Sequence, residues 1–199
     1  MGINLSFLKT LDQIIDEIGS KDVRMLELGN QFIYSLDNRT IQGTSKQYYE
    51  KKDINHTSID INGKDEALPY DLSRQIEKKR LRRCNLITNF GTSEHVSDQY
   101  NCFLNIHNFC SVNGHMVSVV PSCGSWKDHC FYYYTTTFFE SLSSLLNYDI
   151  RECYTINNGI YSKEKGTELV FYHAVKKQDI EFVDKKRFNK EILTHTREK

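Results

Sequence analysis

The sequence lacks several features that would place it in a protein class at once. Its 26 basic and 26 acidic residues leave no net charge, so we expect no global attraction to nucleic acid or to an anionic membrane. No apolar run approaches the roughly 18 residues that span a bilayer. The six cysteines form no CxxC pair and are irregularly spaced, which predicts reduced thiols packed as small apolar groups and no metal site.

Linker and repeat signals are also missing. The 199 residues contain two prolines and ten glycines, with no Pro- or Gly-rich stretch and no internal repeat. One domain covering 1–199 is therefore expected, with an N-terminal helix, a core over 20–176 and a charged tail over 179–199. We expect a cytoplasmic protein. The sequence leaves open whether the tail orders and whether the chain forms a homodimer.

Apolar residues recur in patterns that alternate between strand and helix. Steps of three and four residues predict helices over 5–19, 98–111 and 136–147, with a shorter one near 44–52. Compact or alternating apolar runs predict strands over 23–28, 56–61, 84–90, 115–120, 149–156 and 168–175. This alternation predicts an α/β sheet with right-handed crossovers. A polar turn alone separates the last two strands, so they should pair antiparallel.

The stretch VRMLELGNQFI at 23–33 ends a buried strand in Gly29, as many nucleotide-binding sites begin. A nicotinamide dehydrogenase would need GxGxxG here, and LGNQFI does not supply it. By itself the stretch is equally consistent with a strand end whose glycine serves a turn.

The order of motifs resembles the class I S-adenosylmethionine-dependent methyltransferases. The matching segments are LELG (26–29), SIDI (58–61), LPYDLS (68–73), LITNFGTSEHV (86–96) and IHNFCSVNGHMVSVVP (106–121). The resemblance implies a three-layer Rossmann-like fold whose mostly parallel sheet has its last strand antiparallel. It also implies S-adenosyl-L-methionine as methyl donor, S-adenosyl-L-homocysteine as product, and O- or N-methylation of a small molecule.

The resemblance assigns the first cofactor motif to the turn after the first strand. Gly29 would lie beside the methionine part of the cofactor, and Glu27 would support the loop or the cofactor's amino group. Asn30 and Gln31 stand where bare backbone usually meets the cofactor. Their side chains could hydrogen-bond it or block it.

The adenosine part would meet the next two motifs. Asp60, followed by Ile61, would accept hydrogen bonds from the ribose hydroxyls, and its alternative is a solvated turn acid before Asn62. Asp71 would accept from the adenine amino group while Leu72 packs on the ring. The alternative for Asp71 is an N-cap.

The loop after the strand at 84–90 would lie near the transferred methyl group. By resemblance, Asn89, Phe90 and Gly91 contact the cofactor there. Glu94 is a candidate for acceptor binding, and His95 for the base that takes a proton near neutral pH. Alternatively, Glu94 and His95 cap and pack the following helix.

The aromatic segment WKDHCFYYYTTTFF at 126–139 is the expected wall of the acceptor pocket. His129 is a second candidate base and acceptor contact, and Tyr132 and Tyr134 are further polar candidates. The alternative is a hydrophobic lead into the helix at 136–147.

Two departures from the family pattern favour another function. The glycine loop keeps Gly29 alone, and Asp60 and Asp71 are 11 residues apart, too few for the usual intervening helix. That helix is therefore expected to be reduced or absent, which would open one sheet face near the adenine. The alternative is a catalytically inactive, methyltransferase-like binding or scaffold protein.

Overall fold

A six-stranded sheet forms the centre of the computed structural model, which describes residues 2–35, 40–157 and 168–198. The strand order is β5-β2-β6-β7-β10-β9. Its strands are β2 (Arg24–Leu28), β5 (Asn55–Ile59), β6 (Cys84–Phe90), β7 (Cys110–Pro121), β9 (Tyr148–Asn157) and β10 (Glu168–Lys176). The first four strands of that order are parallel, and β10 is antiparallel to both of its neighbours. The expected sheet is confirmed; the expected turn between β9 and β10 lies outside the described residues.

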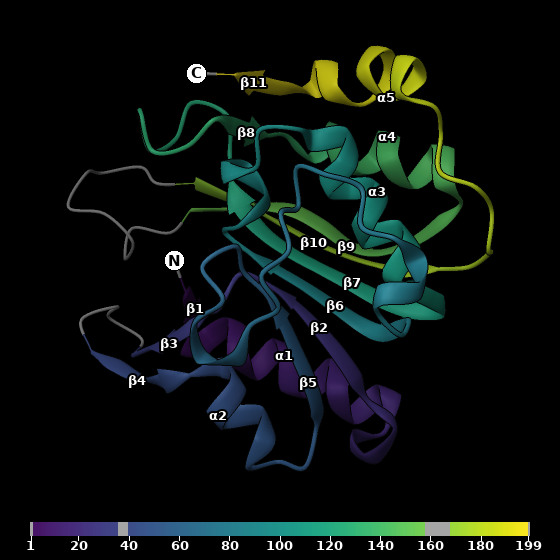
Figure 1. Ribbon diagram of the computed structural model, residues 1–199. Helices are drawn as coiled ribbons and strands as arrows, with labels where there is room; N and C mark the ends of the chain where they lie inside the picture. The colour runs from purple at the N-terminus through teal and green to yellow at the C-terminus, as the bar shows by residue number, and fades with distance from the viewer. Residues whose placement is uncertain (1, 36–39, 158–167, 199) are drawn as a thin grey trace.

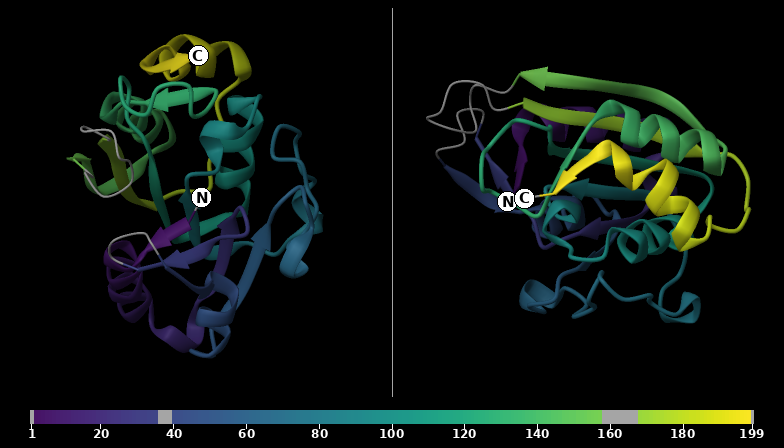
Figure 2. Two further views of the ribbon diagram at one scale, coloured as in Figure 1. Left: turned by 90° about the vertical axis from the view of Figure 1, so that its left-hand side faces the viewer. Right: turned by 90° about the horizontal axis from the view of Figure 1, so that it is seen from above.

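Helices cover both faces of this sheet and make three layers (Figure 1). The helices are α1 (Leu5–Ile18), α2 (Ser45–Glu50), α3 (Gln99–Phe109), α4 (Thr136–Leu146) and α5 (Lys185–Glu191). One face carries α3, α4 and α5, as the view from above in Figure 2 also shows, and the other carries α1. Two apolar clusters fill the spaces between the layers. Among the described residues, no helix is both long and apolar enough to cross a membrane.

Side-chain caps explain where the helices begin. Asn4 accepts a hydrogen bond from the Ser6 amide at 2.8 Å, and Asp98 accepts one from Asn101 at 3.0 Å. These bonds satisfy amides that the first helical turn leaves unpaired. Gly19 ends α1 with φ of 90°, a left-handed torsion that favours glycine. The expected helix boundaries are confirmed to within two residues for α1, α3 and α4.

Two small sheets were not expected from the sequence. One is formed by β1 (Gly2–Asn4), β3 (Phe32–Tyr34) and β4 (Ile41–Thr44). In the other, β8 (Tyr132–Tyr134) pairs with β11 (Thr196–Glu198). All five strands have only three or four residues, too few to show a clear alternating pattern.

The charged tail is an ordered part of the core. Phe188 on α5 is fully buried and its ring lies 5.7 Å from that of Tyr100 on α3. Ile192, just after α5, is also fully buried. These two apolar residues anchor a segment whose other side chains are mostly charged.

The crossover between β5 and β6 contains no α-helix, as the short spacing predicts. Residues 60–83, all described, form turns and two 3-10 segments at Lys64–Glu66 and Lys78–Arg80. Asn105 on α3 holds this segment, accepting from the Ile76 amide at 2.9 Å and donating to the Arg74 carbonyl at 2.8 Å. Leu72 and Ile76 are buried in the core. The sheet face that was expected to be open is therefore covered by irregular chain.

Candidate functional site

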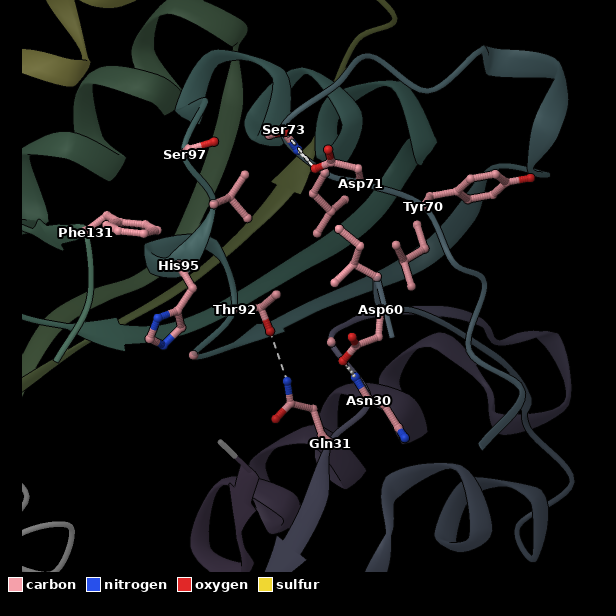
Figure 3. A pocket seen from close by; sticks show the side chains of 16 residues that line it. Asn30, Gln31, Asp60, Tyr70, Asp71, Ser73, Thr92, His95, Ser97 and Phe131 are labelled. Carbon is pink, nitrogen blue, oxygen red and sulfur yellow. Dashed lines mark hydrogen bonds between the residues drawn. The ribbon is translucent and has the colours of Figure 1, made fainter. Parts of the chain in front are cut away.

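A cavity of about 600 Å³ lies beyond the carboxyl ends of β2, β5 and β6. Gly29, Asp60 and Gly91 follow these three strands and line it (Figure 3). Parallel α/β sheets bind ligands at this edge, and small-molecule pockets measure about 300–1,000 Å³. The cavity therefore has both the place and the size of a ligand site.

The turn at Gly29 depends on the absence of a side chain. Its φ of 77° lies in the left-handed region, and its amide donates to the Ile59 carbonyl at 2.7 Å. A Cβ here would lie 2.5 Å from Thr92 Oγ1 and 2.6 Å from Gln31 Nε2. Both contacts are closer than nonbonded atoms tolerate, so the turn requires glycine.

Gln31 fills the position of a missing glycine and is folded back onto the strand ends. Its Nε2 donates to the Leu28 carbonyl and to Thr92 Oγ1, both at 3.0 Å. Thr92 in turn donates its hydroxyl to Leu28 at 2.7 Å. The Gln31 Oε1 atom is buried and has no hydrogen-bond partner among the described residues.

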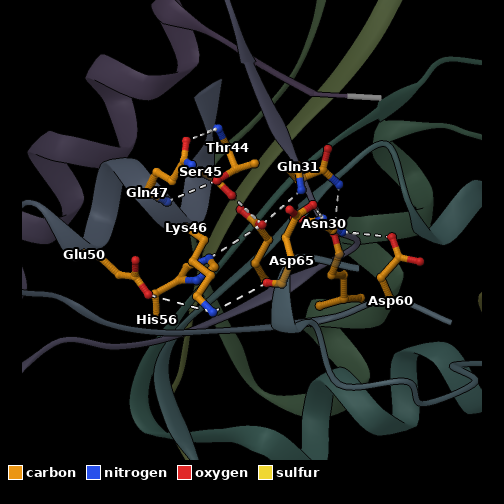
Figure 4. Close-up of polar contacts among 12 residues, drawn as sticks. Asn30, Gln31, Thr44, Ser45, Lys46, Gln47, Glu50, His56, Asp60 and Asp65 are labelled. Carbon is orange, nitrogen blue, oxygen red and sulfur yellow. Dashed lines mark hydrogen bonds and ion pairs between the residues drawn. The ribbon is translucent and has the colours of Figure 1, made fainter. Parts of the chain in front are cut away.

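Asn30 is held on the other side of the same turn (Figure 4). Its backbone amide donates to Asp60 at 3.0 Å, and its side chain donates to Asp65 at 2.5 Å. The side-chain oxygen of Asn30 has no partner in the described part of the chain. Asn30 and Gln31 thus leave the cavity open and each keeps one acceptor atom unused.

The two acidic candidates Asp60 and Asp71 both line the cavity. Asp60 also accepts from the Asn62 amide at 3.1 Å, so each carboxylate oxygen has one backbone donor and retains acceptor capacity. Asp71 accepts from the hydroxyl and amide of Ser73 at 2.6 and 2.9 Å. These bonds, with Arg74 nearby, hold the pKa of Asp71 below its usual value. Asp71 therefore holds a local turn and still faces the cavity, but no helix begins at Ser73, so the N-cap alternative is wrong.

Ile61 and Leu72 line the cavity as expected. Ile61 is 71% exposed at its rim, whereas Leu72 is buried. Tyr70 also contributes to the lining and was not expected from the sequence.

Glu27 lies behind the turn and outside the cavity lining. Its Oε1 accepts from the Ser45 hydroxyl at 2.6 Å and from the Gln31 amide at 3.2 Å. It is fully buried, and the His56 ring lies 3.6 Å away. Of its two expected roles, this position matches support of the loop.

Asn89 and Phe90 also lie outside the lining, contrary to expectation. Asn89 is buried and exchanges hydrogen bonds with the Ser93 amide and hydroxyl at 3.0 and 2.8 Å. Successive strand residues point to opposite faces, and the Phe90 ring packs against Phe7 of α1 at 6.0 Å. Gly91 alone of the three expected residues reaches the cavity.

Glu94, His95 and His129 form a cluster beside the cavity, but Glu94 and His129 lie outside its lining, contrary to their expected contact with the acceptor. His95 lines the cavity, and its Nε2 lies 3.9 Å from Glu94 Oε1. The rings of His95 and His129 are 5.1 Å apart and nearly perpendicular. Burial raises the pKa of Glu94 to about 8, while burial and the nearby His129 lower the pKa of His95 to about 4. Burial also lowers the pKa of His129.

The aromatic segment contributes less to the cavity than its composition suggests. Phe131 lines it and is 54% exposed. Tyr132 lies outside the lining and donates to the Ser97 carbonyl at 3.1 Å. Tyr134 is fully buried, with its hydroxyl 2.9 Å from Ser93 Oγ and 2.7 Å from Gln99 Oε1. Tyr134 is thus a core residue, because β8 places it beneath α3 and α4.

Several lining residues were missed by the sequence reasoning. They are Ile59, Tyr70, Ser73, Thr92, Val96, Ser97 and Phe131. Thr92 and Val96 belong to the motif LITNFGTSEHV after β6, and Ser97 follows it directly. Their side chains are small and neither charged nor aromatic, so the sequence offered no reason to select them.

Comparison with known proteins shows similarity in structure alone. No protein-family model matches the sequence, and no curated protein matches it. Among solved structures, 1,6-didemethyltoxoflavin-N1-methyltransferase of Burkholderia thailandensis, with S-adenosylhomocysteine bound, is similar with a TM-score of 0.57 at 12% identity. The match covers 83% of this chain and 76% of that one.

Two further methyltransferase structures have a similar fold. The O-methyltransferase of a polyketide synthase from Brevibacillus brevis, in complex with S-adenosyl-L-homocysteine, matches with a TM-score of 0.50 at 9% identity, covering 92% and 74% of the two chains. A SAM-dependent methyltransferase of Methanosarcina mazei matches with a TM-score of 0.50 at 11% identity, covering 82% and 97%. The chain therefore has the Rossmann-like fold of the class I S-adenosylmethionine-dependent methyltransferases.

Proposed function

We propose that this chain is an S-adenosylmethionine-dependent methyltransferase that methylates an oxygen or nitrogen atom of a small molecule. The observation that carries the proposal is the cavity lined by Gly29, Asp60 and Gly91 at the ends of three adjacent parallel strands. Two structurally similar methyltransferases have S-adenosylhomocysteine bound, which supports the choice of cofactor.

The donors and acceptors of the cavity fit the methionine part and the ribose of this cofactor. The side-chain oxygens of Asn30 and Gln31 are buried and without partners among the described residues, and a change of rotamer would let them accept hydrogen bonds from an ammonium group. The Asp60 carboxylate can accept from two vicinal hydroxyls with charge-assisted strength. The side chains that replace the missing glycines would therefore bind the cofactor rather than exclude it.

The far end of the cavity fits a purine. Ile61, Tyr70 and Leu72 supply apolar surface, and the ionised Asp71 supplies an acceptor for an exocyclic amine. Gly29 and Gly91, both with positive φ, let the backbone approach the bound molecule closely.

The bound cofactor would supply an electrophilic methyl group on a sulfonium. The protein's own contribution is positioning and proton handling. The lowered pKa of His95 keeps its imidazole neutral near pH 7, which leaves a nitrogen free to receive the proton of an acceptor hydroxyl or amine, but it also makes His95 a weaker base than a free histidine. His129 lies beside it, and Phe131 supplies apolar surface for an acceptor.

One observation favours the second function, a cofactor-free binding or scaffold protein. The Gln31 amide is tied to both Leu28 and Thr92, so this loop cannot rearrange around a ligand without breaking two hydrogen bonds. The two functions differ in one measurable property, because a scaffold would bind a macromolecular partner and neither form of the cofactor.

Calorimetric titration of the purified chain with S-adenosylhomocysteine separates them. We expect saturable binding of one molecule per chain, weakened about 10- to 100-fold by Asp60→Ala, because a hydrogen bond to a charged group contributes about 1.5–3 kcal/mol. Asp149→Ala, on edge strand β9 away from the cavity, is the matched control. No binding heat from the unmodified chain, or equal affinities of all three proteins, would refute the enzyme proposal.

A further inference from the structure

Three metal-binding side chains meet beside the cavity although they are distant in the sequence. Glu94 and His95 belong to a 3-10 turn after β6, and His129 comes from the loop before β8. Each offers one ligand atom, and these three atoms all lie within 4.8 Å of one another. The sequence predicted no metal site because this grouping arises only when the two loops come together.

Glu94 is the least expected member of the cluster. It is fully buried, and neither carboxylate oxygen has a hydrogen-bond partner among the described residues. The Nε2 atom of His129 is likewise buried and without a partner there. Burying polar atoms without partners costs free energy, most of all for a carboxylate. A ligand that takes up these lone pairs would remove that cost.

The loop that carries His129 is held in place by contacts of its own. The imidazole stacks on the Trp126 indole with ring centroids 3.9 Å apart. The His129 amide donates to the Tyr133 hydroxyl at 2.9 Å, and that hydroxyl donates to the Trp126 carbonyl at 2.9 Å. His129 is therefore oriented before any ligand binds, which is what a metal site requires of its ligands.

We propose that Glu94, His95 and His129 bind a divalent transition-metal ion of the Zn²⁺ type. One carboxylate and two imidazoles suit Zn²⁺, Co²⁺ or Fe²⁺ better than Mg²⁺ or Ca²⁺, which prefer oxygen ligands alone. Three protein ligands leave a coordination position for another molecule. An ion about 2.1 Å from each ligand would bring the ligand atoms to roughly 3.4 Å apart, so the side chains, which now lie within 4.8 Å of one another, would draw closer on binding.

His95 connects the ion to the cavity, because it belongs to both the cluster and the lining (Figure 3). The consequence for catalysis rests on the proposed function. An acceptor hydroxyl bound to the ion would lose its proton to water more readily. Its oxygen would then form a bond to the methyl carbon as the carbon–sulfur bond breaks, with the electrons of that bond staying on sulfur. His95 would act as a ligand in this state rather than as the base.

Metal binding can be tested without the cofactor. Chelator-treated protein is titrated with ZnCl₂ by calorimetry and with CoCl₂ by visible absorption, where the cobalt bands also report whether any cysteine thiolate binds. We expect one ion per chain and no thiolate band. Glu94→Gln and His129→Asn should each weaken binding about 100-fold, and His195→Asn, outside the cluster, should leave it unchanged.

Glu94→Gln also shows whether a loss of metal binding is caused by unfolding rather than by the missing ligand. It preserves the shape of a buried side chain, so its melting temperature should stay close to that of the unmodified chain. Absence of Zn²⁺ binding by the unmodified chain, binding unaffected by both variants, or binding through thiolates would overturn the proposal. S-adenosylhomocysteine affinity, measured on the same samples without metal, reports separately on the proposed function.

Discussion

The Gln31 amide donates to the Thr92 hydroxyl at 3.0 Å and joins the loop after β2 to the loop after β6. The bond passes beside Gly29, where a Cβ would lie within 2.6 Å of both participating atoms. The one glycine left in the loop therefore permits a side-chain contact between two strand ends. The Gln31–Thr92 hydrogen bond therefore shapes the part of the cavity next to Gly29, where further glycines would otherwise stand.

Replacing Thr92 by valine should loosen this junction. Valine has nearly the same shape but leaves Gln31 Nε2 with one acceptor fewer and the Leu28 carbonyl without its Thr92 donor. We expect a loss of about 1–3 kcal/mol in the free energy of unfolding, measured by urea denaturation. Thr137→Val on the exposed face of α4 is the control and should change stability by less than about 0.5 kcal/mol. Equal effects of the two substitutions would show that the junction contributes nothing.

Gly29→Ala can be compared with Gly124→Ala to separate backbone strain from steric contact. Both glycines have positive φ, 77° and 86°, but a Cβ at Gly124 would meet nothing within 4 Å. Gly124→Ala should cost about 1–2 kcal/mol from the left-handed torsion alone. Gly29→Ala should cost more and should also weaken S-adenosylhomocysteine binding, because Gln31 or Thr92 must shift. Both denaturation curves and calorimetric affinities are needed, and equal stability losses would argue against the close contact.

Acid should destabilise the protein through its buried histidines. Burial, with His115 and Arg151 nearby, lowers the pKa of His173 to about 4, and burial with Lys176 nearby does the same for His107. Their unfolded pKa is 6.5, so the unfolded chain binds more protons between pH 6.5 and 4. The free energy of unfolding should therefore fall as pH drops through this window, by at most about 1.4 kcal/mol per pH unit for each histidine.

His173→Gln is the variant that tests this pH dependence. It removes one titrating group. The slope of the free energy of unfolding against pH between 4 and 6.5 should therefore decrease by the contribution of one histidine. His195→Gln, which is partly exposed near the C-terminus, is the control. A slope left unchanged by His173→Gln would mean that His173 does not titrate with unfolding.

The sequence predicted the central sheet well, because its strands have five residues or more and carry compact or alternating apolar patterns. The crossover without a helix followed from counting the residues between Asp60 and Asp71. The small sheets could not be foreseen, since strands such as Phe32–Tyr34 and Thr196–Glu198 are defined by distant partners. Local pattern carries no information on such pairings.

In the cavity, too, residues placed by local sequence were predicted, and residues placed by contacts between distant segments were not. Residues at strand ends, such as Gly29, Asp60 and Gly91, were placed correctly because strand direction fixes where they lie. Tyr134 was misplaced because its burial depends on packing beneath α3 and α4, and its hydroxyl has partners in Ser93 and Gln99. The grouping of Glu94 with His129 was missed for a similar reason, since two separate loops create it.

The most direct measurement is a crystal structure of the chain grown with S-adenosylhomocysteine. We expect the ribose hydroxyls at the Asp60 carboxylate, the adenine between Ile61 and Leu72, and the amino group at the side-chain oxygens of Asn30 and Gln31. The ligand bound elsewhere, or the cavity empty at saturating ligand concentration, would contradict the claim that this cavity is a methyl-donor site.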